Sequence, residues 1–453
     1  MGKAARVKTP PLRQADWDAP EDRPDPVALL EEQGKTRLAE LLPIRYGRML
    51  ASPFAFYRGA AAIMANDLAQ TPNTGLLVQL CGDAHLANFG GFASPERDLV
   101  FDIDDFDETL PGPWEWDLKR LATSFEIAGR ERGLEEKERR STVLTAVAEY
   151  RRAMAEFATM GNLDVWYSLL DEAKIIARWG ATAKPKAIKA FSQDFAMAHS
   201  RDNARAFEKL TRRVDGMLQI VSNPPLVVPI AELLPQADGQ GFDQELRMLI
   251  RKFRTSLQGD RRHLMERYEV VDIARKVVGI GSVGLSAWIM LFVGRDEQDT
   301  LFLQCKEAQS SVLEAHLGKS LYADHGRRVV EGQRLIQAAS DIFLGWDRAT
   351  TIVDHIPHDF YVRQLMDWKL SLNTGIMTPR ELTLYGQMCG WTLARAHARS
   401  GDSIAIAAYL GNGSQFDRAL AEFVVTYADQ NERDFQALVE AAKSGRVKAK
   451  SGV

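Results

Sequence analysis

Strand-like segments occur in two separate parts of this 453-residue chain, and segments with helical periodicity fill most of the remainder. The strand signals are short apolar or alternating runs at residues 54–57, 76–81, 99–103, 276–284, 287–294 and 301–305. Helices are expected, from apolar residues at steps of three or four, at residues 116–157, 164–178, 203–221, 243–268, 382–399 and 416–442. The sequence shows no internal repeat, and this order of segments predicts an α+β fold.

Composition divides the chain further. Residues 1–28 carry five prolines among charged residues, so we expect a flexible arm there. A stretch with prolines and glycines at 223–241 is the best internal boundary. The expected parts are the arm at 1–28, a helical part at 29–260, a smaller strand-rich part at 261–366, a second helical part at 367–445 and a basic tail at 446–453.

The bulk properties of the chain exclude several classes of partner. Lys and Arg total 57 against 61 for Asp and Glu, so no overall positive field attracts nucleic acid or an anionic membrane. Cys81, Cys305 and Cys389 each lie in an apolar run, as expected for buried thiols in a reducing compartment. No apolar run reaches the roughly 20 residues that cross a bilayer, and the N-terminus does not resemble a signal peptide. A cytoplasmic protein is expected.

The densest polar cluster follows the strand expected at 76–81. On this loop Asp83 precedes Asn88 by five residues, with His85 between them. Such spacing lets a carboxylate orient a nucleophilic hydroxyl while the amide oxygen binds a metal ion. A strand-end turn, in which Asp and Asn bind nearby backbone groups, has the same sequence pattern. Both interpretations stay open for this loop by itself.

An acidic run follows at residues 102–108, and it contains five carboxylates within seven residues. Such carboxylates repel one another, so a bound cation is favoured over a solvated acidic edge. Magnesium prefers oxygen ligands and takes few of them from protein. We expect Mg²⁺ here, with Asn88, Asp102 and Asp105 as the candidate ligands.

A second cluster lies about 200 residues later, where a glycine-rich run stands between two expected strands. It comprises Gly279, Gly281, Ser282 and Gly284, and Lys306 follows the third strand. A glycine run between two strands indicates a hairpin whose amides cover phosphates, rather than a dinucleotide-binding turn that leads into a helix. An ordinary hairpin with a surface lysine is the alternative.

Together the two clusters resemble the protein-kinase-like superfamily, and most closely its aminoglycoside- and choline-phosphotransferase branch. The resemblance to the catalytic loop of that branch, Gly-Asp-x-His-x-x-Asn, rests on Gly82, Asp83, His85 and Asn88. The other motifs that look alike are Asp105-Phe106 for the metal-binding Asp-Phe, Asp117-Leu118 for the start of the next helix, and residues 279–284 with Lys306 for the glycine-rich loop and phosphate-binding lysine. The chain is also similar, through residues 52–59 and 393–399, to a bacterial family catalogued only as a domain of unknown function.

The resemblance implies a two-lobed kinase-like fold with a helix-rich larger lobe. In ordinary kinases the glycine-rich loop precedes the catalytic loop, and here the order is reversed, which is consistent with a circular permutation. The helix expected at 382–399 then packs beside a catalytic loop that comes from the N-terminal half. Residues 361–365, including Gln364, take the position of the hinge between the lobes.

The resemblance also implies roles for single residues. Asp83 would orient the acceptor hydroxyl, and Lys306 would bind the phosphates of ATP after orientation by Glu314 or Glu331. Arg58 is expected either to bind a phosphate or to pair with an acidic residue. For His85, a base and a group that bonds the backbone to hold the loop are the alternatives, whereas His397 is expected in the core.

The expected function is therefore that of an ATP- and Mg²⁺-dependent phosphotransferase acting on the hydroxyl group of a small molecule or a protein. Transfer of AMP by the same fold is chemically compatible with these residues. A pseudokinase-like module that binds nucleotide without turnover is a rival from another class. A metal-dependent hydrolase built on Asp83 and His85 is a second rival, although one His among several carboxylates suits Mg²⁺ better than catalytic zinc.

Overall fold

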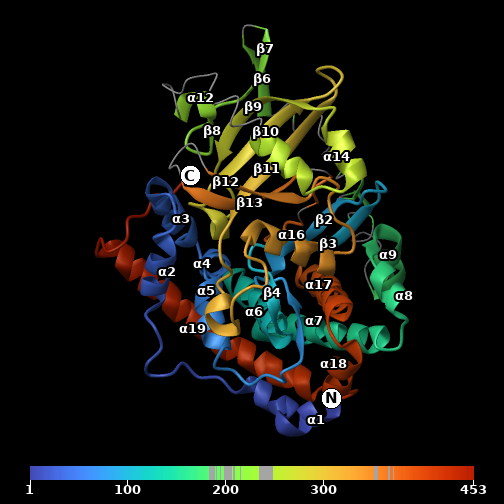
Figure 1. The fold of residues 1–453 in the computed structure, drawn as a ribbon. Coiled ribbons are helices and arrows are strands. Elements are labelled where there is room, and N and C mark those ends of the chain that lie inside the picture. The colour runs from blue at the N-terminus through green and yellow to red at the C-terminus, as the bar shows by residue number, and fades with distance from the viewer. Residues whose placement is uncertain are drawn as a thin grey trace.

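The structure is a computed structural model of the chain (Figure 1). It describes residues 1–182, 189, 191–193, 195–197, 207, 210–214, 216–233, 248–350, 356–365, 368–370 and 372–452. Within these residues the fold is α+β, as predicted, with helices and several separate sheets. The largest sheet lies at the top of the view in Figure 1, and the longest helices lie below it.

The largest sheet has six antiparallel strands in the order β12-β13-β11-β10-β9-β8. These are β8 (Val227–Pro229), β9 (Glu269–Lys276), β10 (Ala287–Val293), β11 (Thr300–Ala308), β12 (Gly345–Thr350) and β13 (Pro357–Gln364). The strands expected at 287–294 and 301–305 are confirmed. The strand expected at 276–284 is wrong, because β9 ends at Lys276 and the glycines form the loop to β10, with one turn of 3₁₀ helix, η5 (Ile280–Ser282).

Three smaller sheets complete the β structure. They comprise β1 (Leu77–Leu80) with β4 (Leu110–Pro113), β2 (Phe89–Ala93) with β3 (Leu99–Ile103) and β5 (Leu170–Asp171), and β6 (Thr211–Val214) with β7 (Met217–Ile220). The strands expected at 76–81 and 99–103 are confirmed as β1 and β3. The loop with Asp83 runs from β1 to β2 through η3 (Leu86–Asn88).

Four long helices form the main helical core, namely α6 (Glu115–Glu131), α7 (Glu136–Phe157), α17 (Pro379–Ser400) and α19 (Gln415–Lys443). The helices expected at 382–399 and 416–442 are confirmed. Helices α7 and α17 lie so close that a Cβ on Gly390 would be 2.3 Å from the Ala146 carbonyl oxygen. Among the described residues, every helix is too short or too polar to span a membrane.

The remaining helices are shorter. They are α2 (Pro26–Gly34), α3 (Leu42–Met49), α4 (Pro53–Gly59), α5 (Ala61–Leu68), α8 (Asn162–Tyr167), α9 (Glu172–Trp179), α12 (Ile230–Leu233), α14 (Gly259–Met265), α15 (Glu314–Leu317), α16 (His325–Ile336) and α18 (Ser403–Leu410), with 3₁₀ turns η2 (Ala39–Leu41) and η4 (Gly180–Thr182). The strand expected at 54–57 is wrong, because this segment is helix α4. Pro53 takes its first position and Ser52 caps it by accepting a hydrogen bond from the Ala55 N–H.

Three other expected helices differ from the structure. The segment 164–178 is divided between α8 and α9 by the short strand β5. The helix expected at 203–221 is wrong over 211–214 and 217–220, where β6 and β7 pair, and residues 203–206, 208–209 and 215 lie outside the described residues. The segment 243–268 is helical at 248–255 and in α14, and residues 241–247 lie outside the described residues.

The N-terminal segment is packed rather than extended as an arm. It forms α1 (Gly2–Lys8) and the 3₁₀ turn η1 (Pro11–Ala15). A Cβ on Gly2 would lie 1.9 Å from the Ala405 carbonyl oxygen, and the buried Trp17 packs against Tyr427 with 4.9 Å between ring centroids. Burial of this indole overrides the proline-rich composition. The basic tail is also attached, since the Lys450 N–H donates to the Pro43 carbonyl.

Candidate active site

The two polar clusters meet at one cavity of about 420 Å³. The loop between β1 and β2 contributes Asp83 and Asn88, the segment after β3 contributes Asp105, and the six-stranded sheet contributes Lys306 from β11. The loop between β9 and β10 lines the same cavity through residues 278–282. Tertiary structure thus joins segments that lie about 200 residues apart in the sequence.

The backbone at the start of the loop between β1 and β2 is bound by helix α6. Asp117, in the first turn of α6, accepts hydrogen bonds from the N–H groups of Cys81 and Gly82, at 2.8 and 3.0 Å. Gly82 has φ +85°, and a Cβ there would lie 2.3 Å from the Glu108 carbonyl oxygen, so this position requires glycine. His397 lies in the core, as expected, 3.4 Å from Asp117.

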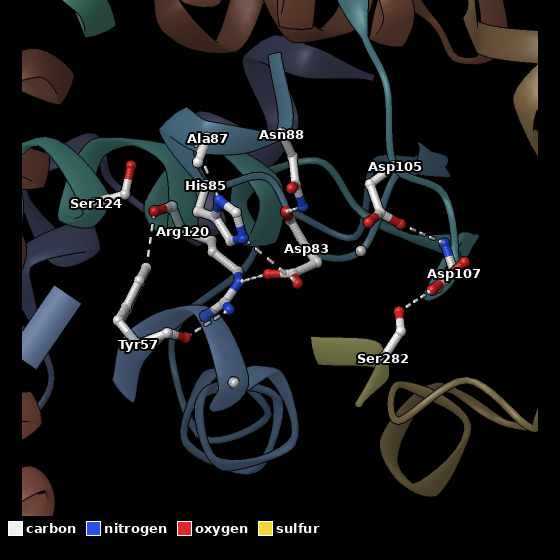
Figure 2. Close-up of polar contacts among 12 residues, drawn as sticks. Tyr57, Asp83, His85, Ala87, Asn88, Asp105, Asp107, Arg120, Ser124 and Ser282 are labelled. Atoms are coloured by element: carbon white, nitrogen blue, oxygen red, sulfur yellow. Dashed lines mark hydrogen bonds and ion pairs between the residues drawn. The ribbon is translucent and has the colours of Figure 1, made fainter. Parts of the chain in front are cut away.

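The carboxylate of Asp83 is fixed by Arg120 (Figure 2). Arg120 Nε donates to Asp83 Oδ1 at 2.5 Å, and the same guanidinium donates to the Tyr57 carbonyl at 3.0 Å. The guanidinium also lies 4.4 Å from the centroid of the Tyr57 ring. A carboxylate held in this way suits the orientation of a substrate hydroxyl.

His85 is buried beneath the same loop. Its Nδ1 accepts a hydrogen bond from the Ala87 N–H at 3.2 Å, which places the ring proton on Nε2, 3.8 Å from Asp83 Oδ2. Burial lowers the pKa of His85 to about 3, so the imidazole is neutral. This geometry favours the interpretation in which His85 holds the loop in shape over a role as base.

Asn88 and Asp105 offer oxygen atoms on the same side of the cavity (Figure 2). The Asn88 amide nitrogen donates to the Asp83 carbonyl at 2.9 Å, which leaves its oxygen available as a ligand. Burial, followed by the charge of Asp107, raises the pKa of Asp105 to about 6, and a bound cation would offset this cost. In the described part of the chain, no three His, Cys, Asp or Glu side chains group closely enough to hold a metal ion. Asn88 and Asp105 could thus hold Mg²⁺ only together with phosphate and water as its other ligands.

Asp102 does not line this cavity, and its prediction as a metal ligand is wrong. The side chain is buried and accepts a hydrogen bond from the Arg395 guanidinium at 2.5 Å. It also accepts from the N–H of Ala338 at 2.7 Å and from its neighbour Ile103 at 2.9 Å. Its lone pairs are thus used to bind a buried cation from helix α17.

We expect Asp102→Asn to lower the free energy of unfolding by about 3–5 kcal/mol, because it leaves Arg395 buried without its counter-charge. Urea denaturation measures this loss. Asp429→Asn is the matched control, since Asp429 pairs with Arg130 at the surface and is 51% exposed, and its change should stay within about 0.5 kcal/mol. Equal stability of the two variants would contradict the structural role of Asp102.

Lys306 pairs with Asp107, and neither glutamate expected for this role is its partner. Lys306 Nζ lies 2.7 Å from Asp107 Oδ2. Glu314 instead lies 3.9 Å from His325 and Glu331 lies 3.8 Å from Arg327. Neither glutamate lines the cavity, so the assignment of Glu314 to the nucleotide site is wrong. The partner of Lys306 belongs instead to the acidic run at 102–108, because β11 packs against this run in the fold.

Asp107 is the centre of a small network. Tyr361 donates to Asp107 Oδ1 at 2.6 Å. Ser282 donates to Asp107 Oδ2 at 2.8 Å (Figure 2). Burial alone would raise the pKa of Asp107, but the Lys306 charge and these hydrogen bonds lower it to about 2. Burial alone would also lower the pKa of Lys306, and the Asp107 charge raises it. Both groups are therefore charged at neutral pH.

The glycine-rich loop is held from outside by the N-terminal half of the chain. Arg48 donates to the Val278 carbonyl at 2.5 Å and Arg37 donates to the Val283 carbonyl at 2.6 Å. Gly284 has φ +93° and its carbonyl accepts from the Leu38 N–H at 2.8 Å. Isolated arginines form no pattern in a sequence, so Arg37 and Arg48 carry no signal that predicts them as partners of this loop.

The amides of this loop are available for a ligand. Within the described residues, no group accepts a hydrogen bond from the N–H of Gly279, Ile280 or Gly281. A Cβ on Gly279 would meet nothing within 4 Å, which leaves open space next to this backbone. Several backbone amides with no acceptor, beside the Lys306 ammonium, form an arrangement that suits phosphate.

Two further predicted residues line the cavity. Gln364 lies at the end of β13, and residues 366–367, which follow it, are outside the described residues. Arg58 lies at the C-terminal end of α4, and its backbone oxygen would be 3.6 Å from a Cβ on Gly281. No described residue forms an ion pair or side-chain hydrogen bond with Arg58, so its expected pairing with an acidic residue is not present.

A family model described as "Uncharacterized protein conserved in bacteria (DUF2252)" matches residues 37–441. This range includes the loop between β1 and β2, the glycine-rich loop, Lys306 and helix α17. The comparisons with curated proteins and with solved structures gave no match.

Proposed function

Since the chain belongs to the bacterial family DUF2252, whose description assigns no activity, we propose from the site itself that it is an ATP- and Mg²⁺-dependent phosphotransferase. The observation that carries this proposal is the meeting of two incomplete clusters at one cavity. Lys306 and Asp107 are 199 positions apart in the sequence, and their side chains lie 2.7 Å apart. The cluster with Asp83 alone lacks the phosphate-binding groups. The glycine-rich cluster alone lacks the groups proposed to bind the metal ion and the acceptor.

Each part of the cavity has a role in this proposal. The amides of residues 279–281 and the Lys306 ammonium bind the phosphates of ATP. Asn88 and Asp105 would hold Mg²⁺, which neutralises charge on the phosphates. Asp83 orients the hydroxyl of the acceptor in line with the γ-phosphorus. Phosphoryl transfer passes through a loose transition state, so positioning and charge neutralisation supply most of the rate enhancement.

We also propose that the fold is a circularly permuted, two-lobed kinase-like fold. The six-stranded sheet and its glycine-rich loop would be the smaller lobe, and the helices would form the larger lobe (Figure 1). A contact of helix α17 supports the permutation. Tyr385 on α17 donates to the carbonyls of Leu86 and Phe89, at 2.7 and 2.9 Å. A helix from the C-terminal part thus supports a catalytic loop from the N-terminal half.

Binding of ATP with Mg²⁺ should raise the thermal midpoint of the protein. At a ligand concentration of a hundred times the dissociation constant, the expected stabilisation is about 2.7 kcal/mol. Thermal denaturation with ATP alone, with ATP and Mg²⁺ and with ATP and EDTA measures the effect and its dependence on the metal ion. If millimolar ATP leaves the thermal midpoint equal to that of the protein without nucleotide, whether Mg²⁺, Mn²⁺ or no divalent ion is present, the nucleotide site is refuted.

A further inference from the structure

The catalytic loop contains no charged cation of its own. Residues 82–90 include no Lys or Arg, and the imidazole of His85 is neutral and buried. A phosphoryl group in transit from ATP to an acceptor next to Asp83 carries negative charge on three equatorial oxygens. A cation at this end of the cavity must therefore come from another element.

Most cations near this position are already engaged. Arg120 is bound to Asp83 and to the Tyr57 carbonyl. Lys306 is paired with Asp107. On the β13 side, Arg363 donates to the carbonyl of Asp104 at 3.0 Å and to a Gln304 side-chain oxygen at 3.3 Å. None of these groups can turn fully toward a ligand without breaking a contact.

Arg58 differs from these cations. Its side chain is partly buried at the cavity, and its Nε is enclosed with no acceptor within hydrogen-bond distance among the residues that the structure describes. Burial lowers the pKa of Arg58, while the charges of Asp83, Asp105 and Asp104 act in the opposite direction. These carboxylates line the same cavity as Arg58, where Asp83 is paired with Arg120 and Asp104 with Lys369. An arginine remains charged at any physiological pH, so this arrangement leaves a guanidinium with unused donors.

Resting on the proposed function, we propose that Arg58 binds the phosphoryl group during its transfer and stabilises it more strongly in the transition state than in bound ATP. In this step the acceptor oxygen forms a bond to the γ-phosphorus. The bond from the γ-phosphorus to the bridging oxygen breaks, its electron pair stays on ADP, and the acceptor proton passes to Asp83 or to water. The planar guanidinium presents parallel N–H donors, which match the equatorial oxygens of the γ-phosphoryl group.

The test compares binding of ADP with Mg²⁺, before and after addition of fluoroaluminate, which mimics the planar phosphoryl group. Calorimetry is carried out on the full chain as wild type, Arg58→Ala, Arg58→Lys and Arg152→Ala. We expect fluoroaluminate to tighten the binding of ADP to the wild-type protein. In Arg58→Ala this gain in affinity should be smaller, by on the order of 10²-fold. The affinity of Arg58→Ala for ADP alone should be nearly unchanged. Arg58→Lys should keep part of the gain, because it retains charge without the paired donors. Arg152 is 53% exposed and away from the cavity, so its variant should match wild type.

Different failures have different meanings. A gain from fluoroaluminate in Arg58→Ala equal to that of wild type would overturn the role of Arg58. An equal loss of ADP and fluoroaluminate binding would also overturn it, because Arg58 would then act on the ground state. Wild-type protein that binds ADP with no gain from fluoroaluminate would reject the inference and leave the nucleotide site standing. Wild-type protein that binds no nucleotide at all would reject the proposed function itself.

Discussion

Asp83→Asn should retain nucleotide binding and lose phosphoryl transfer by two to four orders of magnitude, on the order expected for a group that positions the nucleophile. The substitution preserves size, and it removes the charge that orients the acceptor hydroxyl. The Arg120 guanidinium can still donate to the amide oxygen, but it is 3% exposed and loses its counter-charge, so some loss of stability is expected and folding of the variant is checked first. Turnover, or basal ATPase activity when no acceptor is known, and calorimetric binding of ATP with and without Mg²⁺ measure the two effects.

Asp105→Asn is the matched comparison, because it removes one carboxylate from the same cavity. This carboxylate is proposed to hold Mg²⁺, so the variant should lose Mg²⁺-dependent ATP affinity as well as turnover. Equal loss of metal-dependent binding in Asp83→Asn and Asp105→Asn would show that the roles are divided wrongly. Wild-type turnover in Asp83→Asn would reject the catalytic assignment. The products of the reaction also show whether AMP or the γ-phosphoryl group is transferred.

Lys306→Ala should combine a loss of ATP affinity with a loss of stability. The lysine is proposed to bind the phosphates, so its binding defect should resemble that of Asp105→Asn. In addition, Asp107 is left partly buried without its counter-charge, although Tyr361 and Ser282 still donate to it. The expected destabilisation is on the order of 3 kcal/mol. Urea denaturation and calorimetry of the same preparations separate the two effects.

The double variant with Lys306→Ala and Asp107→Asn tests whether the unpaired Asp107 charge causes the loss of stability. It should recover part of the lost stability, because no unpaired charge remains, and it should not recover ATP affinity. Glu331→Gln serves as the control, since Glu331 is the other predicted partner and lies 3.8 Å from Arg327 instead. A loss in Glu331→Gln comparable to that in Lys306→Ala would contradict the geometry of this site.

Local sequence alone determined much of this protein. The motif of Gly82, Asp83, His85 and Asn88 is recognised within seven consecutive residues. Helix α17 also follows from local signals, because Thr378 and Glu381 form a capping box before a long apolar face. The alternating residues of β3 are local as well. Hydrogen bonds and periodicities within a few residues determine such features.

Only the tertiary structure decided which charged groups meet. Asp102 and Asp107 lie in one acidic run, yet one pairs with Arg395 on a buried helix and the other with Lys306 on a strand. Sequence spacing cannot distinguish them, because each partner comes from a distant segment. Burial likewise made the segment before residue 28 a packed element, since Trp17 reaches the core. Desolvation and long-range packing determine these outcomes, and they depend on the whole chain.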